Sequence, residues 1–229
     1  MINGVTEKLR ADAQSFAKLF KYLEPRWADQ MVDQGSVRIG TLFDFRHKEA
    51  HGKERGDELE GVRVTMTDGR AGTFAGEEIP AFLKDSLRIP EGVAIQFAEG
   101  AVLRQHASVP DMYVYCTCHQ FSEALLTRFG GACVEIHQPE KFFAAITGTL
   151  AEWDEYGVRR ARGFSLAACE YRDREQTWPR ASRYNPVFRK PRRYQHQAEV
   201  RAAWRPLARR IRPLDLTVRS ITDWCRRRQ

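Results

Sequence analysis

The sequence predicts an α+β protein with a mixed, largely antiparallel sheet and flanking helices. Two observations predict this class: segments with the composition of strands outnumber segments with helical periodicity, and no regular strand–helix–strand alternation continues along the chain. With 229 residues, of which 42% are hydrophobic and 11% aromatic, the chain is long enough to bury a substantial core. We therefore expect a single domain over residues 1–229.

The first elements alternate in type. Residues 5–18 have the pattern of a short amphipathic helix, and residues 19–23, LFKYL, have the aromatic and aliphatic content of a strand. A helix is expected over 24–35, because a proline lies in its first turn and a glycine at its end. A strand at 36–45 follows it.

Residues 46–61 are almost wholly charged, so we expect a long surface loop there. Its acidic end, with Asp57, Glu58 and Glu60, is placed to fold back over a site.

The rest of the chain consists mainly of strand-like segments separated by glycines and prolines. Strands are expected at 62–67, 72–76, 92–103, 111–121, 129–137, 164–173 and 194–204, and helices at 77–87 and 138–153. The second of these helices carries Phe142, Phe143 and Ile146 on one side, which indicates core packing.

The segment YQHQAEVRAAW, residues 194–204, carries the main candidate site. In a strand, alternation places Gln197, Glu199 and Arg201 on one face. A carboxylate in a cleft can hold ribose hydroxyls and stabilise the cation that develops when a glycosidic bond opens, while an amide two residues earlier can orient the acceptor. The alternative interpretation is an ion pair between Glu199 and an arginine on a neighbouring strand.

The net charge of +7 and the pI near 9.3 favour an acidic partner, and the excess lies mostly towards the C-terminus. Arginines there can hold phosphates while aromatic rings stack on bases. The interleaved rings are Tyr184, Phe188, Tyr194 and Trp204. A solvated basic face that keeps the protein soluble is the alternative.

Several common classes are excluded by the motifs that the sequence lacks. It has no phosphate-binding P-loop, glycine-rich dinucleotide fingerprint, H-E-x-x-H motif or G-x-S-x-G elbow. Cys116, Cys118 and His119 lack the spacing of a zinc site, and neighbours on one strand do not face each other as a thiol nucleophile and its base must. The odd, scattered cysteines, together with the absence of a signal peptide or a membrane-spanning run, predict a cytoplasmic protein with no membrane association.

A widespread family of uncharacterised bacterial and phage proteins resembles this chain from about Phe20 to Trp204. The resemblance rests on the order of the segments LFKYL, GSVRIGTLFDFR, RGDELEG, YVYCTCHQF, RFGGACVEI, PEKFFAAI and YQHQAEVR, the last with a Q-x-E-x-R motif.

Parts of the same pattern resemble the ADP-ribosyltransferase superfamily, whose members cleave NAD at the nicotinamide bond. They use a basic residue or histidine on a first strand, a Ser-Thr-Ser-like motif on a middle strand, and a catalytic glutamate in E-x-E or Q-x-E near the end. The resemblance implies the same type of fold and assigns Glu199 and Gln197 as catalytic. It assigns an NAD-binding role to Lys21, Tyr22, Arg38 and Thr117. Lys21 stands where the superfamily usually has arginine or histidine, and cysteines replace both serines. Arg38 can supply the bidentate grip on a pyrophosphate that a lysine lacks.

The function that the resemblance implies is that of an ADP-ribosyltransferase-like toxin or phage-conflict factor. It would cleave NAD as a co-substrate and transfer ADP-ribose to a macromolecule. A nucleic acid is the acceptor expected first, from the basic C-terminal third, and an antitoxin or regulatory protein is a further expected partner. Two alternatives remain open: a non-catalytic nucleic-acid-binding module, and a nuclease that binds a divalent cation through Asp57, Glu58 and Glu60.

Overall fold

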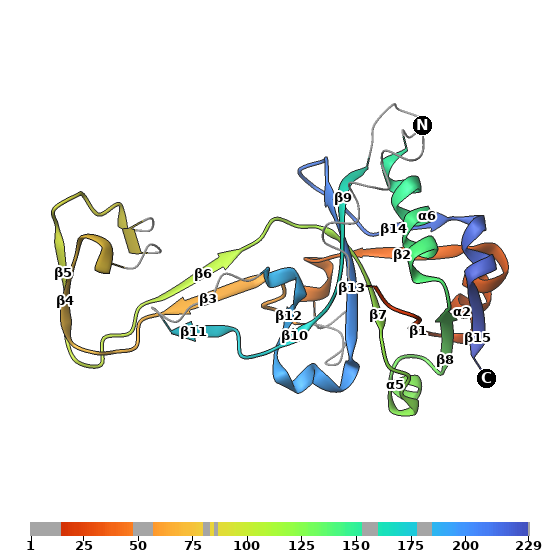
Figure 1. Cartoon of the computed structure of the whole chain (residues 1–229), viewed down its shortest axis with the longest axis horizontal. Coiled ribbons are helices and arrows are strands. Elements are labelled where there is room, and N and C mark those ends of the chain that lie inside the picture. Colours follow the sequence, from red (N-terminus) through yellow and green to blue (C-terminus); the bar gives the residue numbers. More distant parts are fainter. Residues whose placement is uncertain are drawn as a thin grey trace.

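The computed structural model describes residues 15–47, 57–79, 83–84, 87–152, 160–177 and 185–228. Among these residues, helices and a large, mostly antiparallel sheet confirm the predicted α+β class. A body holds this sheet, and an arm of shorter strands extends away from the body (Figure 1). Every helix in the described part of the chain is too short or too polar to span a lipid bilayer.

The main sheet has eight strands. Six of them follow the order β14–β2–β7–β1–β8–β15, and β13 pairs with β7 and with β9. All pairings in this sheet are antiparallel. The strands are β1 (Leu19–Leu23), β2 (Ser36–Thr41), β7 (Tyr113–Cys118), β8 (Ala132–Ile136), β9 (Ala161–Ala168), β13 (Glu199–Pro206), β14 (Leu214–Thr217) and β15 (Cys225–Arg228).

Strand β7 is where the sheet divides. β13 pairs with one edge of β7 along its whole length. The other edge is shared, because β2 pairs with it at Tyr113 and Val114 and β1 pairs with it at Cys118. Between these points, β1 and β2 diverge from β7 into two wings. One wing contains β1, β8 and β15, and the other contains β2 and β14.

Three helices pack around this sheet: α2 (Pro25–Gln34), α5 (Glu123–Arg128) and α6 (Pro139–Ala151). Helix α2 joins the two wings, since it connects β1 to β2 and contacts β2, β8 and β15. Helix α6 covers one face of the sheet, where Phe142, Phe143 and Ile146 are buried in the main core with Trp204. The Trp204 indole N–H donates to the Thr147 hydroxyl at 2.9 Å. Helix α6 therefore anchors β13 from one side.

A two-stranded parallel ribbon precedes β13 in the chain and lies beside it. The ribbon consists of β10 (Glu170–Tyr171) and β12 (Arg189–Lys190). The 3₁₀ helix η4 (Arg192–Gln197) follows β12 and leads directly into β13. The other 3₁₀ helices are η1 (Asp44–Arg46), η2 (Gly76–Glu78), η3 (Pro186–Phe188) and η5 (Arg219–Trp224).

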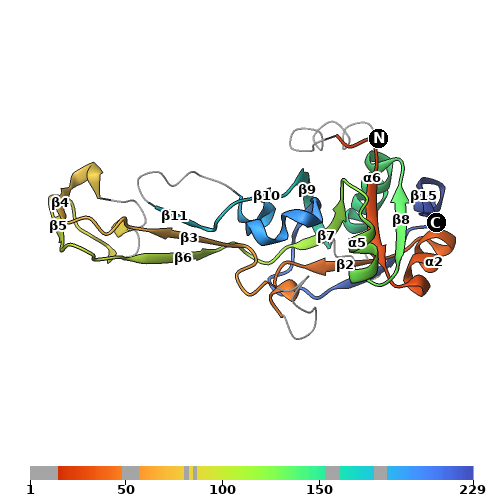
Figure 2. The ribbon, with the colours of Figure 1, turned by 90° about the horizontal axis from the view of Figure 1, so that it is seen from below.

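The arm consists of two small sheets placed end to end (Figure 2). Its strands are β3 (Val62–Met66), β6 (Arg104–Ser108) and β11 (Glu175–Thr177) near the body, and β4 (Gly72–Ala75) and β5 (Ala94–Phe97) at the tip. The tip has its own small apolar cluster around Ile79, Leu83 and Phe97.

Several predicted elements are confirmed. Helices α2 and α6 lie within the predicted ranges 24–35 and 138–153, and β7 and β8 lie within 111–121 and 129–137. The strand LFKYL has the predicted bounds. The helix predicted at 5–18 lies mostly outside the described residues.

Other predictions are wrong in their bounds. The strand predicted at 36–45 ends at Thr41, where a turn and the 3₁₀ helix η1 follow. The strand predicted at 194–204 begins only at Glu199, because the preceding residues form η4. Strands β14 and β15 were not predicted from the arginine-rich sequence, although they extend the two wings.

Gly35 makes the turn between α2 and β2 that brings the chain back towards β7. Its φ of 72° is in the left-handed region, and its N–H caps the helix by donating to the Met31 carbonyl at 3.2 Å. A Cβ at this position would lie 2.3 Å from the Val218 carbonyl oxygen. Only glycine fits this turn without displacing the backbone.

We expect Gly35→Ala to lower the free energy of unfolding by at least about 2 kcal/mol, from the left-handed conformation and the backbone clash together. Gly148→Ala is the matched control, because Gly148 is exposed within α6 and a Cβ there meets nothing within 4 Å. This control should stabilise the protein by about 1 kcal/mol through helix propensity. Urea unfolding measures both, and equal effects of the two substitutions would contradict the role of Gly35.

Candidate functional site

A cleft of about 940 Å³ lies where β1 and β2 diverge from β7. Residues of β1, β2, α2 and β7 line it, together with Lys190 and Arg201. The structure places every site residue predicted from the sequence on the lining of this one cleft: Lys21, Tyr22, Arg38, Thr117, Gln197 and Glu199. They come from four segments that are far apart in the sequence.

The predicted residues do not share one face of the sheet. Glu199 pairs with Cys118 and Val200 with Thr117, so alternation directs Glu199 and Thr117 to opposite faces. Lys21 lies between Phe20 and Tyr22, which pack with Cys118 on the Glu199 side, so Lys21 is directed to the Thr117 side. Because the sheet divides here, the cleft reaches side chains of both faces.

Gln197 and Glu199 are brought together by a turn rather than by strand alternation. Gln197 is the last residue of η4, and Ala198 has φ 43° and ψ 45°, in the left-handed region. Glu199 then begins β13. The prediction that all three polar residues share one strand face is therefore wrong for Gln197, although it holds for Glu199 and Arg201.

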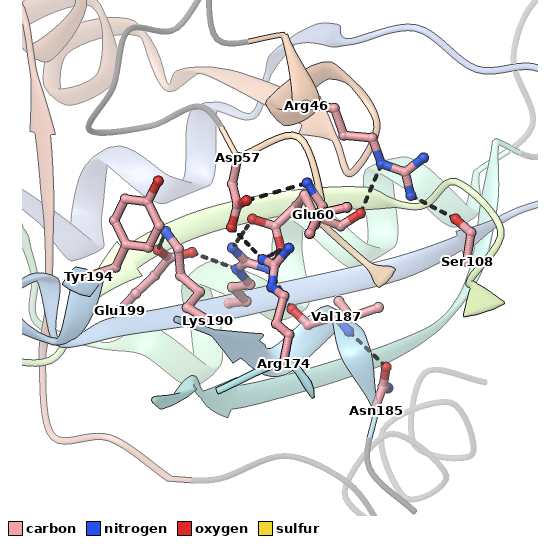
Figure 3. A network of polar contacts seen from close by, with 12 residues as sticks. Arg46, Asp57, Glu60, Ser108, Arg174, Asn185, Val187, Lys190, Tyr194 and Glu199 are labelled. Atoms are coloured by element: carbon pink, nitrogen blue, oxygen red, sulfur yellow. Dashed lines mark hydrogen bonds and ion pairs between the residues drawn. The ribbon is translucent and has the colours of Figure 1, made fainter. Parts of the chain in front are cut away.

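Two cations hold the Glu199 carboxylate, one at each oxygen (Figure 3). The Lys190 ammonium donates to Oε2 at 2.5 Å, and the Arg201 Nε–H donates to Oε1 at 2.5 Å. Lys190 also donates to the Gln197 Oε1 atom at 2.9 Å. All four side chains are buried. The arginine that pairs with Glu199 lies on the same strand, not on a neighbouring one as the alternative interpretation supposed.

The acidic end of the 46–61 segment folds under this site. Glu60 is fully buried and accepts two hydrogen bonds from Arg201, at 2.8 Å and 3.0 Å. Asp57 is 3% exposed and forms an ion pair with Arg174. The expectation that this end folds back over a site is met only in that Glu60 contacts Arg201 from the interior, since Asp57, Glu58 and Glu60 do not line the cleft. The expectation of a surface loop is wrong for Asp57 and Glu60, because each is charge-paired in the interior.

These pairs keep Glu199 and Glu60 ionised. Burial alone would raise the pKa of Glu199, but Arg201 and Lys190 outweigh it and hold the pKa far below that of an ordinary glutamate. Burial likewise opposes ionisation of Glu60, and Arg201 outweighs it, so that pKa is also lowered. Burial opposes the charge on Lys190, but the neighbouring Glu199 carboxylate raises its pKa above the ordinary value. The site therefore presents a permanent carboxylate near neutral pH.

The two predicted residues of β1 have different environments. The Lys21 ammonium donates to the Cys116 carbonyl at 2.8 Å and lies 4.3 Å from the centre of the Tyr115 ring. It thereby bonds a backbone group of β7 at the point where the sheet divides. The Tyr22 hydroxyl accepts the Ser122 N–H at 2.6 Å. Burial raises the pKa of Tyr22 to about 12, so its hydroxyl stays neutral.

Arg38 and Thr117 complete the predicted set. Arg38 is exposed on β2, at the mouth of the cleft, and pairs with Asp215 of β14 at 3.2 Å. Thr117 is 2% exposed, and its hydroxyl donates to the Val200 carbonyl at 3.2 Å. Its hydrogen is thus used within the sheet, which leaves only the oxygen lone pairs for a ligand.

The cysteines on β7 are poor nucleophiles. Burial raises the pKa of Cys116 to about 12, and burial also raises the pKa of Cys118. Both thiols are therefore protonated near neutral pH. The described residues contain no group of three or more His, Cys, Asp or Glu side chains arranged to bind a metal ion. Within the acidic segment, Asp57 and Glu60 face arginines instead, which disfavours the nuclease alternative.

Two of the four aromatic rings predicted to stack on bases are buried. Trp204 is 1% exposed and Tyr194 is 5% exposed, and Phe188 packs against an apolar cluster. Tyr184 lies outside the described residues. The prediction that these rings stack on bases is therefore wrong for Trp204 and Tyr194, whose surfaces are needed for packing.

Lys190 is the site residue that sequence reasoning missed. It lies in the run RKPRRY, which has the composition of an exposed basic segment, yet both Arg189 and Lys190 are 3% exposed. Their burial follows from the pairing of β12 with β10, which no local pattern indicates. Asp57 and Glu60 were singled out in the sequence, but their pairing with the buried arginines Arg174 and Arg201 was not predicted.

Comparison of the chain with protein-family models, with curated proteins and with solved structures finds no match in any of the three.

Glu60→Gln tests the charge network, because it leaves Arg201 with one carboxylate instead of two. We expect it to lower the free energy of unfolding by roughly 3–5 kcal/mol, the usual cost of breaking a buried pair. Glu123→Gln, on the exposed first turn of α5, should change it by less than about 0.5 kcal/mol. Urea denaturation gives both values. An unchanged stability of Glu60→Gln would show that the Arg201 charge is satisfied without Glu60.

Proposed function

We propose that the cleft binds NAD and that the protein cleaves its nicotinamide–ribose bond, transferring ADP-ribose to a macromolecule. One observation carries the proposal: an ionised, doubly anchored Glu199 carboxylate lies in a cleft that also presents Lys21, Arg38, Thr117 and Gln197. The volume of about 940 Å³ lies near the upper end of the range for small-molecule sites, which suits a dinucleotide.

Cleavage of the nicotinamide–ribose bond requires a fixed negative charge near the ribose rather than a base. When the bond between the ribose C1′ and the pyridinium nitrogen breaks, its electron pair stays with nicotinamide, which leaves as a neutral molecule. Positive charge then develops on the ribosyl carbon and ring oxygen. A carboxylate that accepts a ribose hydroxyl hydrogen bond stabilises this charge. Glu199 suits that role because both of its oxygens are held in place and its charge is permanent.

The acceptor completes the reaction. Its oxygen or nitrogen forms a bond to C1′ and releases a proton to solvent, and water as the acceptor gives free ADP-ribose. Gln197 is adjacent to Glu199 on the cleft wall and is the residue we assign to orienting the acceptor. Lys21 and Arg38 supply positive charge for the pyrophosphate, and Tyr22 and Thr117 supply oxygen atoms that line the cleft.

A nucleic acid is the acceptor we propose to test first. The end of β13 and its connection to β14 expose several arginines, namely Arg205, Arg209, Arg210 and Arg212. Exposed arginines attract phosphate backbones without requiring base contacts. A protein is the second acceptor class.

Purified protein incubated with NAD labelled in the adenylate half should release nicotinamide and leave the label on RNA, DNA, protein or free ADP-ribose. Glu199→Gln should lower this rate at least about 100-fold, whereas Glu123→Gln should not change it. Circular dichroism and urea unfolding of both variants establish that they are folded. If wild-type protein neither binds NAD nor releases nicotinamide with any of these acceptors, the proposal is refuted.

The lowered pKa of Glu199 also predicts the pH profile. The carboxylate is charged above its folded pKa, and that pKa lies below the ordinary glutamate value of about 4.3. Loss of the charge on Glu199 should therefore not slow NAD cleavage as the pH falls from 8 to about 5. A rate that falls tenfold or more per pH unit in this window would show that a group of higher pKa controls the reaction.

A further inference from the structure

The ribbon of β10 and β12 contacts Glu199 at two points. In this parallel pair, Tyr171 lies opposite Lys190 in register. The Tyr171 hydroxyl accepts the Glu199 backbone N–H at 2.6 Å, and the Lys190 ammonium donates to the Glu199 carboxylate at 2.5 Å. One short ribbon thus holds both the backbone and the side chain of the same residue.

Lys190 also contacts the other residue of the Q-x-E pair. Its ammonium is 2.9 Å from the Gln197 Oε1 atom, and it is 4.8 Å from the centre of the Tyr194 ring. A lysine ammonium has three donors and no acceptor, so the amide can face it only through Oε1. The orientation of the Gln197 side chain is therefore fixed by Lys190, with its NH₂ end directed away from the ammonium.

We propose that Lys190 is a positioning residue that aligns the Gln197 amide and the Glu199 carboxylate for reaction in the cleft. This inference rests on the proposed function, since it assigns Lys190 a part in the same NAD cleavage. Lys190 acts through Gln197 and Glu199.

The turn at Ala198 explains why such a residue is needed. Strand geometry would direct residues 197 and 199 to the same side automatically, but here Gln197 belongs to η4 and Glu199 to β13. Their relative placement depends on Ala198, a residue other than glycine in the strained left-handed conformation. Lys190 bridges this turn by binding the side chains on either side of it.

Lys190 and Arg201 both bind the Glu199 carboxylate, but their other contacts differ. Arg201 is bonded to Glu60 and to the Val187 carbonyl as well as to Glu199, so its guanidinium is held by the interior. Both cations line the cleft, but Lys190 holds the second carboxylate oxygen and also contacts the Gln197 amide. Without Lys190, Glu199 loses one of its two cationic anchors and Gln197 loses its hydrogen bond to the ammonium.

Lys190→Met tests this inference, with Arg189→Met as the matched control. Arg189 is the neighbouring buried cation on β12, and it pairs with Glu170 of β10 at 3.2 Å. We expect Lys190→Met to lower kcat for NAD cleavage about 10- to 100-fold, with KM for NAD changed less than about threefold. Arg189→Met should leave kcat within about threefold of wild type.

A readout that needs no catalysis accompanies the kinetics. Carbon NMR of the Glu199 carboxyl, assigned by its loss in Glu199→Gln, should show a pKa at least about one pH unit higher in Lys190→Met than in wild type. The same pKa should be unchanged in Arg189→Met. If Lys190→Met does not fold, Tyr171→Phe tests the ribbon instead, and we expect it to lower kcat about 3- to 10-fold because the Glu199 N–H loses its partner.

The outcomes are distinguishable. A raised Glu199 pKa with a lowered kcat supports the inference. An unchanged kcat in Lys190→Met, or in Tyr171→Phe where Lys190→Met does not fold, overturns it whatever the pKa. A lowered kcat in Arg189→Met equal to that in Lys190→Met also overturns it, because the effect then comes from disturbing β12. If wild type cleaves no NAD but its Glu199 pKa depends on Lys190, the proposed function fails, the catalytic part of the inference fails with it, and the contact itself is verified.

Discussion

The Glu199 carboxylate, held between Lys190 and Arg201, is the interaction on which the rest of the site depends. Moving a carboxylate out of water costs several kcal/mol unless cations and hydrogen-bond donors replace the water. Here Lys190 of β12 and Arg201 of β13 donate to the carboxylate, Glu60 of the acidic segment balances the charge of Arg201, and the Tyr171 hydroxyl of β10 accepts the Glu199 backbone N–H. Four distant stretches of chain are therefore folded around one charge.

The elements that the sequence predicted well are those with a strong local pattern. Helix α6 is marked by apolar residues at helical spacing, such as Phe142, Ile146 and Leu150, and β7 by an uninterrupted run of β-branched, aromatic and cysteine residues. Strand β14 is only four residues long, and the arginines of β15 have the composition of a solvated segment, although here they pair with acids such as Glu135 and Asp29. The assignment of both strands depends on pairing with β2 and β8, which is a tertiary effect.

The candidate site divides in the same way. The residues of the cleft were selected from short motifs and their order along the chain, and the structure gathers them on one lining. The local geometry of these residues could not be predicted from the sequence. The strand-like pattern of YQHQAEVR continues through Ala198, which is left-handed and ends the 3₁₀ helix η4. Lys190 and the pairing of Glu60 were not accessible either, since charged residues are normally assigned to the surface and only a specific partner makes their burial tolerable.

The division of the sheet at β7 has a mechanical consequence. β2 and β1 are each joined to β7 through a few residues at opposite ends of one edge, whereas β13 is joined to it along its entire length. A change in the angle between the wings would widen or narrow the cleft while β7 and β13 stayed rigid. Glu199 and Lys190 belong to this rigid side, and Lys21 and Arg38 belong to the wings. The fold therefore places the carboxylate and its two anchoring cations on the wall formed with β7 and β13, and it places Lys21 and Arg38 on the walls formed by the wings.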